Sequence, residues 1–250
     1  MAETSAPDNR FARPLEQMEA QEKQLAEVAM KAARASFAGF EERPGSEYHA
    51  APGLTPEQTW VRLAEELGRV SALTALEGYR DETLGVDDIE LIHQGIFMPV
   101  FGDMTLGFRS GRGQDVTFPI VKGKLKAPEL SVRRGSGGKQ VRPNLGKALA
   151  SFEREVAAIQ VIGRPSVKEA AHAAVRLYAK VIGIHPFFDG NGRTAWAILS
   201  FALQRCGLVE IAIAPSDTTR WALGCALRQN GSQSYEPLTD LVVEAIKDSA

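Results

Sequence analysis

The chain has 250 residues, of which 44% are hydrophobic, an ordinary content for a globular protein with a proper core. Its 29 basic and 31 acidic side chains give a formal net charge of −2, which argues against DNA binding through a basic surplus. The sequence has no apolar run of the ~18 residues that a membrane span needs and its charged beginning is not a secretory signal, so we expect a cytoplasmic protein, or a secreted bacterial effector of the same composition.

The N-terminal part predicts a helix between two irregular stretches. Residues 1–14 are polar. From Leu15 to Phe37 the apolar residues mostly recur at helical spacing, which predicts an amphipathic helix. Residues 41–53 contain two prolines and two glycines and predict a linker.

A strong helix-start signal follows the linker. Thr55 is expected to cap the helix, Pro56 to occupy its first position, and Gln58 to complete a capping box. The helix should end near Gly78.

The next segment predicts one helix and then a hairpin. Asp87 is expected to cap a helix that continues through Phe97. The glycine- and proline-rich stretch 99–142 predicts loop, with strands at 115–121 and 124–127 on either side of a turn.

The remaining sequence predicts further helices. The helix at 145–162 is expected to pack inward, and Ser166 is expected to cap the helix at 166–184. The helix at 193–206 is apolar all round and therefore buried at the centre. Cys206 and Cys225 stand in apolar contexts and predict buried thiols rather than a disulfide or metal site. The predicted ranges are 145–162, 166–184, 193–206, 218–228 and 238–246.

Nine residues between the second and third of these helices, 185–193, combine several chemical groups. They contain the imidazole of His185, the carboxylate of Asp189, a Gly-Asn-Gly run and the guanidinium of Arg193. An imidazole, whose ordinary pKa is ~6.5, can take a proton from a hydroxyl, and a carboxylate can hold a divalent cation. Backbone N–H groups at the start of a helix can bind phosphate, and an arginine can neutralise remaining charge.

The simpler interpretation is a turn. Asp-Gly-Asn-Gly is common in turns, because Gly and Asn tolerate positive φ, and Pro186 fits the end of a helix. Eight specified positions between two apolar segments are, however, too many for a chance match, which favours a functional loop.

The string His-Pro-Phe-Phe-Asp-Gly-Asn-Gly-Arg resembles the signature of the Fic family at every fixed position. The resemblance implies a mostly α fold, a helical bundle with a small β-hairpin flap over the active-site loop. It also implies transfer of AMP from Mg-ATP to a Ser, Thr or Tyr hydroxyl of a target protein or of the chain itself. We therefore expect a tail, helix and linker at 1–53, a candidate inhibitory helix at 54–83 and a Fic-like catalytic domain at 84–250.

By the same resemblance His185 is the general base and Asp189 the ligand of Mg²⁺. Gly190, Asn191, Gly192 and Arg193 bind the phosphates of the nucleotide. Phe187 is expected to pack into the core and fix the loop, and it is given no chemical role.

The chain departs from the family pattern where many members carry a second arginine, because Trp196 stands there. Loss of one charge-assisted contact to the terminal phosphate costs about 1.5–3 kcal/mol. The departure leaves two other donors open, UTP and CDP-choline.

A family element that inhibits the enzyme has only a partial counterpart. Residues 73–78 resemble the inhibitory helix, with Glu77 as its glutamate, but Leu73 stands where a hydroxyl residue belongs. Glu77 would also meet Trp196 instead of an arginine. An exposed glutamate before a helix-ending glycine is the plain alternative.

A non-catalytic binding module on the same fold is the alternative from another class. The complete set of His185, Asp189, Asn191 and Arg193 argues against it. The oligomeric state and the target protein are not indicated by the sequence.

Overall fold

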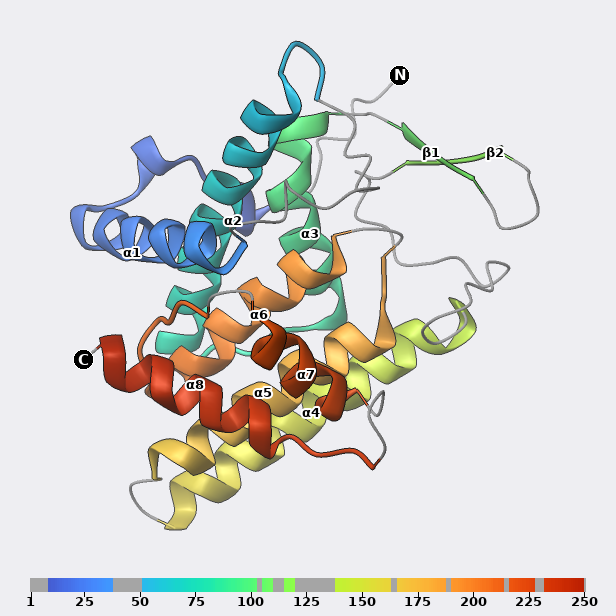
Figure 1. Ribbon diagram of the computed structural model, residues 1–250. Helices are drawn as coiled ribbons and strands as arrows, with labels where there is room; N and C mark the ends of the chain where they lie inside the picture. Colours follow the sequence, from blue (N-terminus) through green and yellow to red (C-terminus); the bar gives the residue numbers. More distant parts are fainter. Residues whose placement is uncertain are drawn as a thin grey trace, which may run out of the picture.

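The computed structural model describes residues 9–37, 51–102, 105–109, 115–119, 138–162, 166–187, 190–213, 216–227 and 232–249. The described part is mostly helical (Figure 1). Its helices are α1 (Ala20–Phe37), α2 (Pro56–Tyr79), α3 (Val86–Phe101), α4 (Gly138–Ile162), α5 (Val167–Ile184), α6 (Asn191–Arg205), α7 (Asp217–Ala226) and α8 (Glu236–Ser249).

Helix α6 forms the centre of the bundle (Figure 1). It packs against α2 and α5, and almost every residue from Asn191 to Leu203 is buried. This confirms the prediction from its apolar sequence, since a helix that is apolar all round has no side suited to water.

Helices α2 and α6 make a close contact. The Thr74 hydroxyl donates a hydrogen bond to the carbonyl oxygen of Ala197 at 2.8 Å. A Cβ atom on Gly78 would lie 2.4 Å from the carbonyl oxygen of Phe201, so only glycine allows this approach. The two helices are therefore held in one relative position.

The predicted capping boxes are present. Thr55 and Gln58 bond each other's backbone N–H groups at the start of α2, and Ser166 and Glu169 do the same at α5. The prediction that Asp87 caps α3 is wrong: the cap is Gly85, whose N–H donates to Asp88 at 2.7 Å.

Several predicted boundaries differ from the structure. Residues 15–17 form a separate 3₁₀ turn, and α1 begins only at Ala20. Helix α3 continues to Phe101 with Pro99 inside it, and α4 begins at Gly138 rather than at 145. Most of the predicted linker, residues 41–50 of 41–53, lies outside the described residues.

The hairpin is composed differently from its prediction. Strand β1 (Thr105–Arg109) pairs antiparallel with β2 (Asp115–Pro119), with Leu106 opposite Phe118. The predicted first strand is therefore real, but its partner lies upstream, and 124–127 lies outside the described residues. In Figure 1 the two strands lie beside the helical body, and a flap that covers the active-site loop is not seen.

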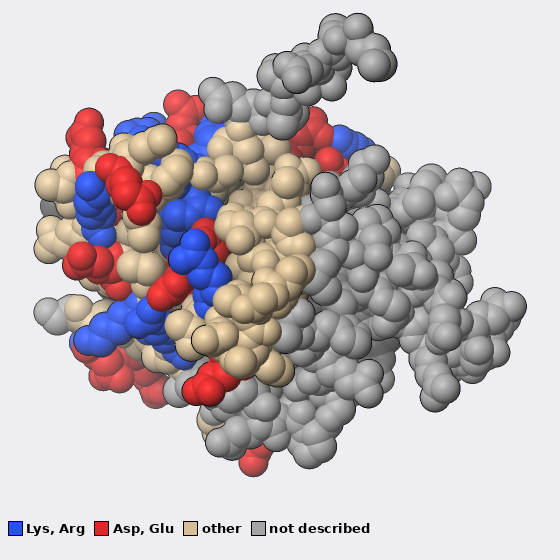
Figure 2. Space-filling view, turned by 90° about the horizontal axis from the view of Figure 1, so that it is seen from above, with Lys and Arg blue, Asp and Glu red and all other residues tan. Residues whose placement is uncertain are grey.

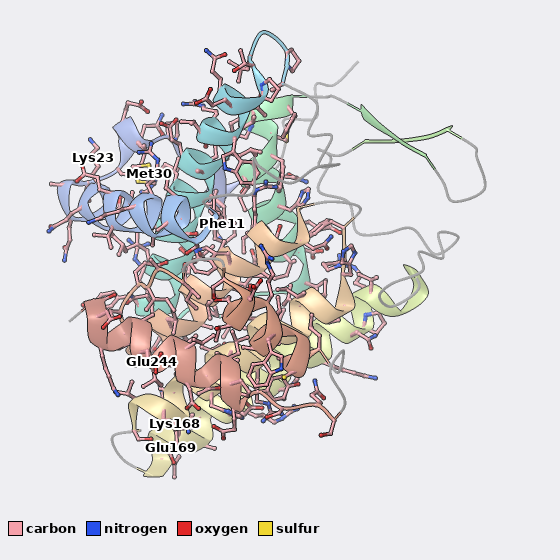
Figure 3. All side chains as sticks on the ribbon, in the orientation of Figure 1. Phe11, Lys23, Met30, Lys168, Glu169 and Glu244 are labelled. Carbon is pink, nitrogen blue, oxygen red and sulfur yellow. The ribbon has the colours of Figure 1, made fainter. Side chains whose placement is uncertain are left out.

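The segment before α1 is fixed to the bundle by a buried arginine. Phe11 is fully buried in the helical body (Figure 3). Arg69 on α2 donates to the carbonyl oxygens of Phe11 and Arg13 and also to that of Gly95 on α3, each within 2.9 Å. One guanidinium thus joins the N-terminal segment to two helices.

Charges of both signs occur over the surface. On the face shown in Figure 2, Lys and Arg interleave with Asp and Glu over the described part. None of the described helices combines the length and apolar character that a membrane crossing requires. Cys206 and Cys225 are free thiols, and burial raises the pKa of Cys206 to about 12.

Candidate active site

His185 occupies a special backbone position at the end of α5. Its φ of 53° and ψ of 61° are left-handed, and its N–H donates to the carbonyl oxygens of Val181 and Ile182, both at 3.1 Å. A non-glycine residue in this region carries a strain of about 1 kcal/mol or more. The sharp change of direction, followed by Pro186, stops the helix and leaves the imidazole partly exposed rather than sealed in the core.

Asn191 closes the loop behind His185. Its Oδ1 accepts a hydrogen bond from the Phe187 N–H at 2.8 Å, and its Nδ2 donates to the Phe187 carbonyl oxygen at 2.9 Å. The same Nδ2 lies 3.4 Å from each ring nitrogen of His185. One buried amide therefore fixes both the loop backbone and the neighbourhood of the candidate base.

Three aromatic rings lie beneath the loop, and we call them the aromatic floor: His93 and Phe97 of α3 and Phe187 of the loop. The His93 ring stacks on Phe187 with centroids 4.0 Å apart and on Phe97 with centroids 4.5 Å apart. All three side chains are buried, and Phe187 is 2% exposed. The prediction that Phe187 packs into the core is confirmed.

Gly190 brings the start of α6 onto this floor. It has a φ of +76°, and a Cβ atom here would lie 2.3 Å from Cζ of Phe97 and 3.0 Å from Nε2 of His93. Its carbonyl oxygen accepts from both the N–H and the hydroxyl of Thr194. The glycine is therefore required by both conformation and space.

The N-terminus of α6 has the properties of an anion site. Gly190 supplies no side-chain cap, and Gly192 is exposed with open space beside it. The first N–H groups of a helix have no partner within it, and the helix dipole places positive charge there. A phosphate group near Gly192 would meet both the N–H groups of the first turn and the positive end of the helix dipole.

Arg193 is the cation of this helix start, but it is not a free surface charge. It is 6% exposed, and its Cζ lies 4.6 Å from the ring centre of Trp60 and 5.7 Å from that of Phe97. The guanidinium is thus placed between aromatic rings of α2 and α3, next to the exposed Gly192.

Asp189, the predicted metal ligand, lies outside the described residues, as does Phe188. Within the described ranges there is no group of three or more His, Cys, Asp or Glu side chains that could hold a metal ion. A Mg²⁺ ion that arrives on nucleotide phosphates needs only one or two protein carboxylates, and the chemistry of Asp189 fits that need.

A small cavity lies beside the end of α5. It measures about 300 Å³ and is lined by Lys147, Lys180 and Ile184, the residue before His185. Burial, with a smaller contribution from Arg176, lowers the pKa of Lys180, whose Nζ donates to the Ser151 hydroxyl. The cavity thus lies beside the last turn of α5, and His185 is not among the residues that line it.

The structure does not bring Glu77 to the loop. Glu77 forms an ion pair with Arg10 at 2.6 Å and lines a cavity formed with the N-terminal segment. It is Thr74 and Gly78 of α2 that face α6, and Gly78 lies at Phe201, towards the opposite end from Gly190. Glu77 therefore does not meet Trp196, which is buried in α6.

Sequence reasoning missed the residues that support the loop. The sequence patterns place Trp60 and Phe97 on two predicted helices but give neither a role at the site, and they do not single out His93. The signal in the sequence was a histidine four residues before Phe97, on the same face of an otherwise apolar helix.

Comparison with known proteins agrees with this geometry. Residues 83–203 match the model of the Fic/DOC family. The chain matches no curated protein.

Solved structures share the fold. A Fic domain-containing signalling protein from Bacteroides thetaiotaomicron is 14% identical, with a TM-score of 0.57 over 94% of this chain and 90% of that one. The N-terminal Fic domain of a VirB-translocated Bep effector protein from Bartonella quintana is 21% identical, with a TM-score of 0.50 over 81% and 89% of the two chains. IbpAFic2 in complex with adenylylated Cdc42 is 16% identical, with a TM-score of 0.55 over 97% and 68%.

The loop between α5 and α6 lies inside the matched range, together with α3 and its two rings of the aromatic floor. Residues 83–203, which include every described residue of this loop, are thus similar to the Fic/DOC family.

Proposed function

We propose that the protein transfers AMP from Mg-ATP to a Ser, Thr or Tyr hydroxyl of a target protein or of itself. The observation that carries the proposal is the arrangement around Asn191, which holds the partly exposed His185 beside the N-terminus of α6. An imidazole and the first N–H groups of a helix lie next to each other there, and transfer of a phosphate-linked group needs a base and an anion site.

In the proposed reaction the acceptor oxygen attacks the α-phosphorus of the nucleotide. The bond from that phosphorus to the bridging oxygen breaks, diphosphate leaves, and the hydroxyl proton passes to the imidazole of His185. The N–H groups of the first turn of α6 and the guanidinium of Arg193 would hold the phosphate oxygens. Mg²⁺, held by Asp189, would neutralise phosphate charge when it is bound.

The comparisons support a reaction of this kind at the level of the family. A structural neighbour was solved in complex with an adenylylated protein, Cdc42. By analogy, the acceptor for this chain would be a hydroxyl on another protein. The target itself is left open by this analogy.

A second donor is favoured by one observation. Trp196 stands where many relatives carry an arginine, and it is 5% exposed within α6. An indole is neutral, so Trp196 supplies no charge to a terminal phosphate. UTP and CDP-choline are therefore tested beside ATP.

The experiment uses ATP and UTP labelled in the α-phosphate and CDP-choline labelled in the choline. Each is incubated with magnesium and the protein, with and without cell lysate. We expect label on protein from one donor, and its loss in His185→Ala. His172→Ala is the matched control, because His172 lies on α5 against Thr239 of α8. Equal transfer by His185→Ala and the unmodified protein would remove His185 from the mechanism, and no binding of any donor would favour a non-catalytic module.

A further inference from the structure

Trp60 lies close to the candidate site although it belongs to α2, before the matched range 83–203. Its ring is partly exposed, and the Arg193 guanidinium carbon lies 4.6 Å from its centre. A guanidinium at this distance from an indole face is attracted to it, and tryptophan is the ring that binds cations best. The contact therefore joins a helix outside the family range to the candidate phosphate site.

The contact defines where the guanidinium lies. Phe97 approaches Arg193 at 5.7 Å, so rings from α2 and α3 both contact one charged plane. An arginine side chain has many rotamers, and ordering them on binding costs free energy that an already fixed side chain does not have to supply. Fixing Arg193 in advance therefore favours phosphate binding.

The helix that carries Trp60 is itself firmly placed. Its start is closed by the Thr55–Gln58 capping box, and its later turns are bonded to α6 through Thr74 and Ala197. Trp60 and Arg193 thus stand on two helices that are fixed relative to each other.

This matters because the loop has few cations. Arg193 is the single Lys or Arg within residues 185–193, and the next positions of the helix, through Trp196, carry no positive charge. The affinity for nucleotide phosphates then depends strongly on how this one guanidinium is held.

We propose that Trp60 is a positioning residue, which holds the Arg193 guanidinium for the phosphates of the donor nucleotide. The inference rests on the proposed function and adds to it a residue outside the matched family range. Replacement of Trp60 should weaken nucleotide binding only through Arg193.

The test is a double-mutant cycle measured by calorimetry with Mg-ATP and its α,β-non-hydrolysable analogue. We expect Trp60→Leu to raise the Kd about tenfold, the effect of one desolvated cation–π contact. Trp60→Phe should keep most of the affinity, because it keeps a ring face. In an Arg193→Ala background, Trp60→Leu should raise the Kd no further.

Trp221→Leu is the control, because Trp221 is 55% exposed on α7. If Trp60→Leu does not fold, Trp60→Met removes the ring but keeps a longer, flexible side chain that fills irregular space, and gives the same comparison. A Trp60→Leu effect that persists unchanged in Arg193→Ala would overturn the proposal, as would wild-type affinity in both Leu and Met variants. Absence of binding by the unmodified protein to ATP, UTP and CDP-choline would instead remove the proposed function, and this inference with it.

Discussion

The side-chain amide of Asn191 forms a two-point hydrogen-bonded ring with the backbone of Phe187, through contacts of 2.8 and 2.9 Å. Phe187 is buried and lies outside any helix or strand, so its N–H and carbonyl oxygen have no partner in secondary structure, and the Asn191 amide supplies both hydrogen bonds. The same amide lies against the imidazole of His185. A residue that we propose to bind phosphate therefore also determines the shape of the loop.

We expect Asn191→Ala to lower the free energy of unfolding by about 2–3 kcal/mol, since two buried backbone groups lose their partners. Transfer activity should fall at least tenfold. Asn191→Asp keeps the acceptor for the Phe187 N–H but loses the donor to the Phe187 carbonyl oxygen. Its stability should therefore lie between that of the unmodified protein and that of Asn191→Ala. Urea unfolding of the three proteins checks the order, and equal stability of all three would contradict this account of the loop.

Two glycines in the loop offer a matched comparison. Gly190→Ala introduces a Cβ atom 2.3 Å from Phe97 at a φ of +76°, whereas a Cβ atom on Gly192 would meet nothing within 4 Å. We expect Gly190→Ala to destabilise by at least about 2 kcal/mol, from strain and overpacking together. Gly192→Ala should be neutral or slightly stabilising, because alanine favours helix.

Thermal unfolding of the two glycine variants separates these effects. A destabilised Gly190→Ala beside an unchanged Gly192→Ala is the expected result. Equal melting temperatures would mean that the aromatic floor yields to the added methyl group. The affinity of Gly192→Ala for nucleotide then tests whether phosphate approaches the start of α6, because the added methyl group stands in the open space beside Gly192.

Local features were predictable from the sequence because they depend on neighbouring residues. The capping boxes at Thr55 and Ser166, and the buried helix α6, follow from short patterns and appear in the structure. The hairpin partner was not predictable in this way. The turn expected between 115–121 and 124–127 favoured a downstream strand, whereas β2 pairs with the upstream strand β1.

The support of the site depends on contacts between distant segments. Trp60 and Phe97 meet Arg193 only because α2 and α3 both pack against α6. A sequence pattern also does not say which face of a helix meets which neighbour. Glu77 matched an inhibitory pattern in spacing, yet the face of α2 that meets α6 carries Thr74 and Gly78.

The position of Glu77 gives a prediction of its own. Because Glu77 pairs with Arg10 of the N-terminal segment and not with a residue of the loop, we expect Glu77→Gln to leave the transfer rate unchanged. Stability should fall by no more than about 1 kcal/mol, since Arg10 is 40% exposed and also pairs with Asp88. A several-fold rise in transfer would instead restore the inhibitory role of Glu77. Glu82→Gln, beyond the end of α2, is the control.

A buried carboxyl far from the loop predicts how stability depends on pH. Burial raises the pKa of Glu210 from 4.5 to about 7, although a hydrogen bond from the Ser200 hydroxyl at 2.7 Å acts in the opposite direction. Among the described residues nothing hydrogen-bonds its Oε2. The native protein therefore keeps this proton more tightly than the unfolded chain does.

A raised carboxyl pKa makes stability fall as the pH rises. Below about pH 4.5 Glu210 is protonated in both states; between there and about pH 7 only the unfolded chain ionises. The loss amounts to about 3 kcal/mol in total, at about 1.4 kcal/mol for each unit of pKa. We expect urea unfolding at pH 5 and pH 8 to show most of this loss, and Glu210→Gln to remove it. Glu244→Gln, on the exposed side of α8 (Figure 3), should behave as the unmodified protein. If the Glu210→Gln and unmodified proteins change in parallel with pH, Glu210 titrates in the native state as it does in the unfolded chain, and burial does not control its charge.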